Sequence, residues 1–197
     1  FITKGEVPKT QRQLFLYQYY TFIKAWFGKD VIGKTLEVGC GRGTVSLYFN
    51  LYDESQITLT DVAPSAIDLA KKNIELAGAT GEAVVAGADT SPFSEGSFDI
   101  VFSIGLLEHL DDYQAIVNEK YRVLQEGGMV ASLNIPKKGS IQVMNKAYRS
   151  LLSLLGKKES LKKDYYRNTH TPAQFKQAFV DAGFKDIEVV YVTPLPM

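Results

Sequence analysis

Three glycines at alternate positions give this sequence its clearest chemical signal. Gly39, Gly41 and Gly43 lie where the apolar run 35–39 gives way to a helix-forming stretch, 45–51. Glycine lets the backbone turn sharply and lets a ligand approach the main chain where a β-carbon would clash. The pattern therefore predicts a ligand-binding turn between a buried strand and a helix.

Acidic residues surround this turn in the sequence. Glu37 precedes it, Asp61 ends the second apolar run, and Asp89 follows the third. In an open parallel sheet, ligands bind beyond the carboxyl ends of the strands, so consecutive strand ends supply contacts to one ligand. Asp61 would accept hydrogen bonds from ribose hydroxyls, and Asp89 from an exocyclic amine such as that of adenine. Taken alone, Asp61 has a second interpretation as the cap of a helix that begins at Pro64.

The glycine spacing separates two classes of nucleotide ligand. Dinucleotide-binding turns carry Gly-x-Gly-x-x-Gly, whereas this turn is Gly-x-Gly-x-Gly with an acid ahead of it. The difference favours a nucleoside without a pyrophosphate. A nicotinamide-dependent oxidoreductase and a nonenzymatic nucleoside-binding module are the two alternatives that the sequence leaves open.

The surrounding segments predict an α/β fold, with a doubly wound, mostly parallel sheet and helices on both faces. Short apolar runs alternate with helix-period segments from about residue 35 to 134. Such near-continuous apolar runs are typical of strands that are buried on both faces. The expected strands are 35–39, 56–60, 83–87, 98–103 and 129–134, with a final strand at 187–192.

Start and stop residues mark the helices between these strands. Pro64 begins one helix and Gly78 ends it, and the glycine pair 127–128 is expected to end the next. Thr171, followed by a proline and then by Gln174, has the pattern of a capping box. A further helix is therefore expected to start there.

Length and composition bound the domain plan. A chain of 197 residues, 45% of them apolar, predicts a single domain over 1–197. Two segments lie outside the alternation of strands and helices: an aromatic helix at about 10–28, expected to act as an N-terminal cap, and an inserted cap at about 137–170. Tyr20 in the first segment, and Tyr166 or its neighbour Tyr165 in the second, are expected to line a substrate pocket.

The charge balance argues against a polyanionic partner. Lys plus Arg and Asp plus Glu both number 22, so no overall positive field draws the protein to nucleic acid or to an anionic membrane. No apolar stretch is long enough to span a bilayer, and a single cysteine fits a reducing cytosol. We therefore expect a cytoplasmic monomer or homodimer that acts on a small molecule and binds no nucleic acid.

Several motifs around the glycine turn resemble those of a known superfamily, the Rossmann-like (class I) S-adenosylmethionine-dependent methyltransferases. Within it, the chain is similar to the small-molecule branch that includes ubiquinone/menaquinone-type methyltransferases. The resemblance covers about 32–192, and its further motifs are LTDVAPS (59–65), GAD (87–89) with PF (92–93) and SFD (97–99), LEHL (107–110) and VLQEGG (123–128). The final antiparallel strand of the superfamily would follow residue 192, where only 193–197 remain, so this strand can be missing.

The resemblance implies S-adenosylmethionine as the cofactor and S-adenosylhomocysteine as the product. It implies that Glu37, Gly39 and Gly41 hold the methionine part, with Cys40 a small residue inside the same loop. The other implied contacts are Asp61 to the ribose, Val62 packed on the adenine ring, Asp89 and Thr90 to the adenine, and Ser103 to the methionine amine through its backbone carbonyl. Val62 has the alternative interpretation of a core valine.

Methyl transfer from a sulfonium is an in-line displacement that requires no metal. Holding the nucleophile, the methyl carbon and the sulfur in line in a water-poor pocket supplies much of the rate. A base is needed only where the acceptor must lose a proton, and the two histidines, His109 and His170, are the catalytic candidates. Each also has a structural interpretation as a residue at the start of a helix. The expected acceptor is a small organic or amphipathic molecule.

Overall fold

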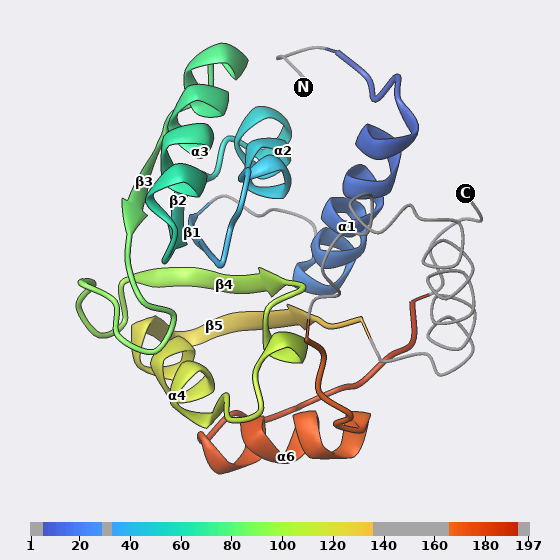
Figure 1. Cartoon of the computed structure of the whole chain (residues 1–197), viewed down its shortest axis with the longest axis vertical. Helices are drawn as coiled ribbons and strands as arrows, with labels where there is room; N and C mark the ends of the chain where they lie inside the picture. Colours follow the sequence, from blue (N-terminus) through green and yellow to red (C-terminus); the bar gives the residue numbers. More distant parts are fainter. Residues whose placement is uncertain (1–5, 29–32, 136–165, 193–197) are drawn as a thin grey trace, which may run out of the picture.

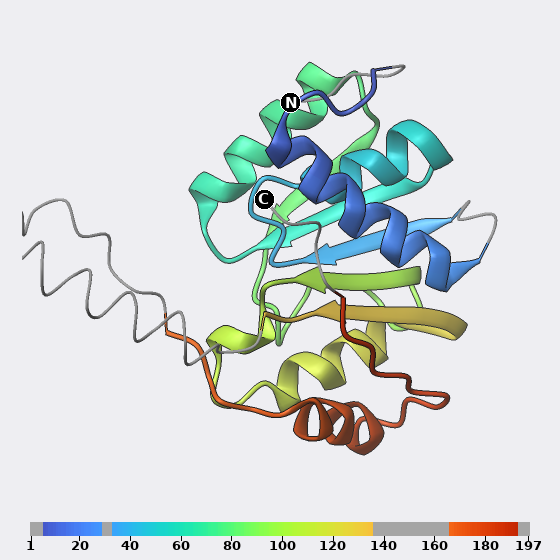
Figure 2. The same ribbon diagram turned by 90° about the vertical axis from the view of Figure 1, so that its right-hand side faces the viewer.

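The computed structural model describes residues 6–28, 33–135 and 166–192. Five strands form one parallel sheet in the order β3-β2-β1-β4-β5, so the chain winds outward from β1 in both directions. The strands are β1 (Lys34–Val38), β2 (Gln56–Asp61), β3 (Gly81–Val85), β4 (Phe98–Ile104) and β5 (Leu124–Leu133). Their arrows end on one side of the sheet (Figure 2), which places the carboxyl ends together.

Helices cover both faces of this sheet (Figure 1). They are α1 (Gln11–Phe27), α2 (Thr44–Asp53), α3 (Pro64–Ala77), the short 3-10 helix η1 (Leu107–His109), α4 (Gln114–Val123) and α6 (Pro172–Asp181). Side chains of α1, α2 and α3 share one apolar cluster with Leu59 and Phe102 of the sheet. On the other face Val101 packs with Val123 of α4, and α6 packs on α4. The doubly wound prediction is confirmed.

Most of the expected helix boundaries are confirmed. Pro64 is the first residue of α3, and Gly78 follows its end with a left-handed φ of +63°. The capping box at Thr171 forms, because its side chain accepts from the backbone N–H of Gln174 and the Gln174 side chain accepts in return. Residues close together in the sequence therefore set these helix ends.

The glycine pair 127–128 does not end a helix, which corrects one expectation. α4 ends at Val123 and β5 begins at the next residue. The β4–β5 register shifts between the pairs Phe98–Leu124 and Ile100–Met129, so the glycines lie in a bulge of the strand. A β-carbon on Gly128 would come within 2.9 Å of a backbone oxygen, which explains glycine there.

The final strand expected at 187–192 is also absent from the described residues. The segment is irregular, and its apolar side chains from Val189 onward are exposed, up to 82% for Tyr191. An apolar β-branched run is therefore not sufficient here to form a ladder. The cap insertion expected at 137–170 falls mainly on residues outside the described ranges, and only 166–170 can be placed.

The expected aromatic helix forms as α1 and packs on α2. A capping box between Thr10 and Gln13 starts it, and Tyr20 and Ile23 are its buried residues. Among the residues that the structure describes, no helix combines the length and the apolar content needed to cross a bilayer.

Candidate functional site

The predicted turn lies at the carboxyl end of β1, at the edge where the strands end (Figure 2). Gly39, Gly41 and Gly43 have φ of +71°, +53° and +66°, the left-handed region that favours glycine. A β-carbon on Gly43 would lie 2.0 Å from Cδ2 of Leu59, whereas one on Gly41 would meet no atom within 4 Å. Gly43 therefore packs the turn on the core, and Gly41 leaves its main chain open to a ligand.

Asp61 lies against this turn. Its Oδ2 accepts a hydrogen bond from the backbone N–H of Gly41 at 3.0 Å, and its Oδ1 accepts one from the N–H of Ala63 at 3.0 Å. Ala63 is the N-cap residue of α3, so Asp61 also supports the start of that helix, as its alternative interpretation expected. A carboxylate has about four lone-pair sites, so two backbone donors leave it able to accept ribose hydroxyls.

Glu37 is a buried carboxyl group in β1, only 4% exposed. Its Oε2 accepts from the backbone N–H of Ser46 at 3.2 Å and from the Ser46 hydroxyl at 2.5 Å, in the first turn of α2. Burial raises the pKa of Glu37 to about 7, because it outweighs these two hydrogen bonds, which lower the pKa. A cationic ligand group close to Glu37 would favour the ionised form.

Three more of the expected cofactor residues are exposed on the neighbouring strand ends. Val62 is 68% exposed, so its interpretation as a core valine is wrong. Asp89 and Thr90 lie in the loop after β3, where a β-carbon on Gly87 would come within 2.8 Å of Oδ1 of Asp89. This edge therefore offers an apolar side chain and oxygen acceptors, the groups that an adenosyl moiety would contact.

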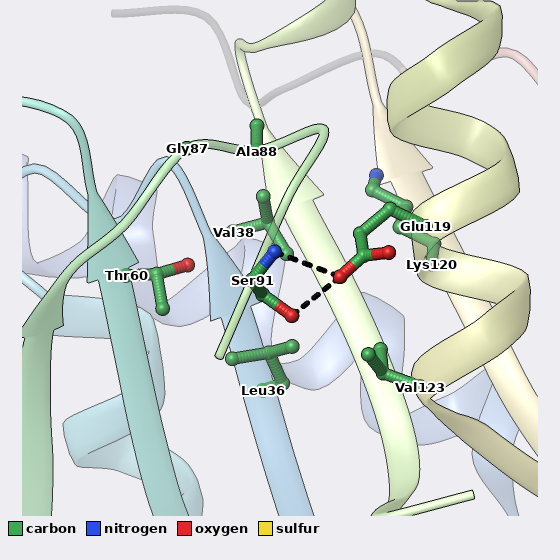
Figure 3. A pocket seen from close by; sticks show the side chains of 9 residues that line it. All are labelled: Leu36, Val38, Thr60, Gly87, Ala88, Ser91, Glu119, Lys120 and Val123. Carbon is green, nitrogen blue, oxygen red and sulfur yellow. Dashed lines mark hydrogen bonds between the residues drawn. The ribbon is translucent and has the colours of Figure 1, made fainter. Parts of the chain in front are cut away.

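A hydrogen-bond network that the sequence did not reveal fixes the loop that carries Asp89. The N–H and hydroxyl of Ser91 donate to Oε1 of Glu119 on α4 at 2.8 and 2.6 Å (Figure 3). Hydrogen bonding from Arg122 is the main reason that the pKa of Glu119 falls to about 2. The cavity between this loop and α4 measures about 10 Å³, no more than one water molecule needs, so it is not a cofactor site.

Ser103 and Cys40 are both buried. The Ser103 hydroxyl accepts from Nζ of Lys120 at 2.6 Å, and the same amine lies 2.7 Å from the hydroxyl of Ser132. Lys120 is 1% exposed, and burial lowers its pKa to about 7. The Ser103 side chain is thus directed at α4, and the implied cofactor contact concerns its backbone alone. Burial raises the pKa of the Cys40 thiol, which fits a small unreactive residue in the loop.

His109 contacts the segment that carries Tyr166. Its Nδ1 lies 2.6 Å from the backbone oxygen of Tyr166. Because a carbonyl only accepts, Nδ1 carries the proton in this contact. Tyr166 is 54% exposed, and its hydroxyl donates to Asp111. Tyr165 lies outside the described residues.

His170 lies in the packing between α4 and α6. Its ring meets the ring of Tyr113 edge-on, with centroids 5.3 Å apart, and Nδ1 is 3.1 Å from the Tyr113 hydroxyl. The ring of Phe175 is 6.1 Å away. These contacts support the structural interpretation of His170.

Tyr20 does not reach the site, which corrects its assignment to substrate binding. It is 3% exposed, and its hydroxyl donates to Oδ2 of Asp53 at 2.7 Å. Asp53 is the last residue of α2, a helix that starts at the glycine turn and runs toward the opposite edge of the sheet. Tyr20 packs there against Tyr17 and Phe49. Aromatic side chains of α1 thus form a cluster with those of α2.

Known proteins are similar to this chain in sequence and in fold. A family model for a methyltransferase domain matches residues 36–132. The demethylmenaquinone methyltransferase of Listeria welshimeri is 30% identical over 171 residues, which cover 79% of this chain and 71% of that protein. The ubiquinone/menaquinone biosynthesis C-methyltransferase of Desulfotalea psychrophila is 28% identical over 177 residues, covering 84% and 71% of the two chains.

A solved structure shares this fold. A SAM-dependent methyltransferase structure from Aquifex aeolicus superposes with a TM-score of 0.69 at 16% identity, and the match covers 93% of this chain and 88% of that one. Neither the nicotinamide-dependent nor the nonenzymatic alternative receives support from these relatives. The chain belongs to the class I S-adenosylmethionine-dependent methyltransferases, and it is similar to their ubiquinone/menaquinone-type branch.

Proposed function

We propose that this methyltransferase acts on a hydroxylated ring compound of the quinol type. As a member of its family, the chain transfers the methyl group of S-adenosylmethionine to a small molecule. The narrower acceptor class is supported by the two relatives, since one name refers to ubiquinone/menaquinone biosynthesis and the other to demethylmenaquinone. Tyr19 of α1, which lies within electrostatic reach of Glu108 after β4, also suits a ring-shaped acceptor.

One observation supports the cofactor site most strongly. The Asp61 carboxylate is held on the N–H of Gly41, and within the described part of the chain a β-carbon on Gly41 would meet no atom within 4 Å. The groups present therefore fit an adenosyl ligand: Asp61 for the ribose, the exposed Val62 for the ring, and Asp89 with Thr90 for the exocyclic amine. When bound, S-adenosylmethionine supplies a methyl group on a sulfonium.

Glu37 and His109 have the chemistry for the reacting end of the site. We assign Glu37 to the methionine ammonium, because the carboxyl is already oriented by Ser46 and gains from a cation. Of the two histidines, His109 is the better base candidate, since it lies in η1, just after the carboxyl end of β4, whereas the ring of His170 packs against Tyr113 and Phe175. His170 is assigned to packing.

The direct test is methyl transfer to a reduced naphthoquinol that lacks a ring methyl group, with S-adenosylmethionine carrying an isotopic label. We expect label in the ring product with the wild-type chain, and a rate lower by about 10²-fold or more in His109→Gln. His170→Gln serves as the matched control and should keep most of the rate. If the label is transferred to another small molecule and to none of the quinols, the proposed acceptor class is wrong.

The oligomeric state, the location in the cell and the absence of nucleic-acid binding stay predictions. We expect a monomer or homodimer, a cytoplasmic location and no binding to nucleic acid, on the basis of the even charge balance and the single cysteine. Light scattering, cell fractionation and a mobility shift with duplex DNA and RNA would check them in turn.

A further inference from the structure

A buried carboxylate at the end of β4 has half of its hydrogen-bonding capacity unused. Glu108, in η1, is 2% exposed. Its Oε1 accepts from the N–H of Ile135 at 3.3 Å, whereas Oε2 has no partner among the residues that the structure describes. Leaving a buried oxygen without a donor lowers stability, so such a group calls for an explanation.

A second unpaired oxygen lies next to it along the chain. Oδ1 of Asn134 is buried without a hydrogen-bond partner in the described part of the chain. Asn134 directly follows β5, and the next residue, Ile135, is the one that donates to Glu108. The N–H of Gly105 donates to the backbone oxygen of Leu133 at 2.8 Å and joins the two strand ends. Both unpaired oxygens therefore belong to the carboxyl ends of β4 and β5.

The backbone that carries Glu108 is held firmly. Asn168, 4% exposed, donates from its N–H to the backbone oxygen of Glu108 at 2.7 Å. Its side-chain Nδ2 donates to the backbone oxygens of Leu107 at 2.9 Å and Leu110 at 2.5 Å. These bonds fix η1, so the direction of the Glu108 side chain is set before any ligand arrives.

An aromatic side chain of α1, that of Tyr19, lies near Glu108. Tyr19 packs on the same buried apolar cluster as Ile104 and Leu133, the last residues of β4 and β5. Burial and, behind it, the Glu108 carboxylate raise the pKa of Tyr19, so the two groups are within electrostatic reach. Phe15 meets Tyr19 edge-on with ring centroids 4.7 Å apart. Tyr19 and, next to it, Phe15 therefore supply aromatic side chains near the Glu108 acceptor.

We infer that Oε2 of Glu108 and Oδ1 of Asn134 form the subsite that recognises a hydroxyl group on the ring of the methyl acceptor. Both oxygens are acceptors, so they need a donor from the ligand, and a carboxylate distinguishes an O–H from an ether or carbonyl oxygen at the same position. This assignment rests on the proposed function and makes Glu108 a specificity-determining residue of that site.

The test compares two ligands that differ only in the donor. The full chain is saturated with S-adenosylhomocysteine and titrated with 2-naphthol and with 2-methoxynaphthalene. We expect wild-type protein to bind 2-naphthol about tenfold more tightly, the usual effect of one hydrogen bond to a charged group. Glu108→Met should remove this preference, and Asn134→Leu should reduce it by about threefold, while both keep the wild-type affinity for S-adenosylhomocysteine.

A matched control uses the third unpaired buried oxygen, the hydroxyl of Thr35 at the start of β1. Thr35→Val should leave the melting temperature unchanged or raised, and Glu108→Met should lower it by no more than the loss of the single hydrogen bond from the N–H of Ile135. Only Glu108→Met should alter the naphthol preference. Should Glu108→Met fail to fold, Glu108→Gln keeps the shape, loses the charge, and should lower the preference by about threefold.

Two failures are distinguishable. If the wild-type chain does not bind S-adenosylhomocysteine, the proposed function is wrong. If it binds S-adenosylhomocysteine but shows no naphthol preference, or binds neither naphthalene, the subsite is wrong on its own. A fall in melting temperature and in S-adenosylhomocysteine affinity in Glu108→Met and Glu108→Gln would make Glu108 structural and overturn the inference.

Discussion

At the ends of β1 and β2 the chain offers main-chain geometry to a ligand, whereas at the ends of β4 and β5 it offers buried side chains. Gly41 and Asp61 are joined by a hydrogen bond between neighbours on adjacent strands. Glu108 and Lys120, by contrast, are buried at 2% and 1% exposure, and neither forms an ion pair within the described ranges. A turn tolerates few residue types, while a buried polar group depends on partners far away in the sequence.

The largest expected effect tests the buried side chains of the second region. The pKa of Lys120, about 7, lies below the value of about 10.4 for an exposed lysine. Between these values the unfolded chain binds more protons, so the free energy of unfolding should rise with pH from about 7 to about 10. The rise is on the order of 4 kcal/mol at its upper limit.

Lys120→Met should remove this rise in urea unfolding curves measured across that pH range. The two serine hydroxyls left behind still lie 3.3 Å from each other and can pair. Lys72→Met, at an exposed lysine of α3, is the control and should leave the slope unchanged. The same slope in wild type and Lys120→Met would show that the buried amine is not the titrating group.

The next effect tests the main-chain geometry of the first region. Gly43→Ala places a β-carbon 2.0 Å from a buried Leu59 atom at a φ of +66°, so we expect a loss of about 3 kcal/mol in stability. Gly41→Ala has a similar φ but meets no atom, so about 1 kcal/mol should be lost. Thermal unfolding of both variants measures the difference, and equal losses would contradict the packing role of Gly43.

Asp61 contacts the turn and is the residue that we assign to the ribose of the ligand. Asp61→Ala should weaken S-adenosylhomocysteine binding by about 1 to 3 kcal/mol, because ribose hydroxyls lose their acceptor. Asp61→Asn keeps one acceptor oxygen for the N–H of Gly41, so its loss of binding free energy should be smaller than that of Asp61→Ala. Calorimetry on folded variants is the measurement, and an unchanged affinity in Asp61→Ala would remove Asp61 from the site.

The smallest effect concerns Glu37. Its folded pKa of about 7 lies above the unfolded value of about 4.3, so its contribution to stability is present at low pH and is lost as pH rises toward 7. A bound ammonium would favour the ionised form. S-adenosylhomocysteine should therefore bind about tenfold more tightly at pH 8 than at pH 6.

Glu37→Gln should make the affinity nearly independent of pH. Because Lys120 titrates in the same range, both proteins are best compared in the Lys120→Met background. An unaltered pH dependence in Glu37→Gln would assign the effect to another group.

The two regions also differ in what the sequence could predict. The sheet, the glycine turn and the place of Asp61 followed from strand runs and glycine spacing, because both depend on residues close together in the sequence. The capping box at Thr171 followed for the same reason. The glycine pair at 127–128 was misread because a helix stop and a strand bulge need the same residue.

The second region could not be predicted in this way. Asn168 holds η1 and Lys120 lies beneath Ser103, yet neither stands in a pattern that signals its partner. Tyr20 was assigned to substrate because helix periodicity does not tell which aromatic faces the core and which faces a site. Only tertiary packing with α2 decided this.

The most direct test of the account is a calorimetric titration of the wild-type chain with S-adenosylhomocysteine and, separately, with NAD. The geometry around Gly41 and Asp61 predicts micromolar binding of S-adenosylhomocysteine and no measurable binding of NAD. Binding of NAD with no response to S-adenosylhomocysteine would contradict the assignment of this edge to an adenosyl ligand without a pyrophosphate.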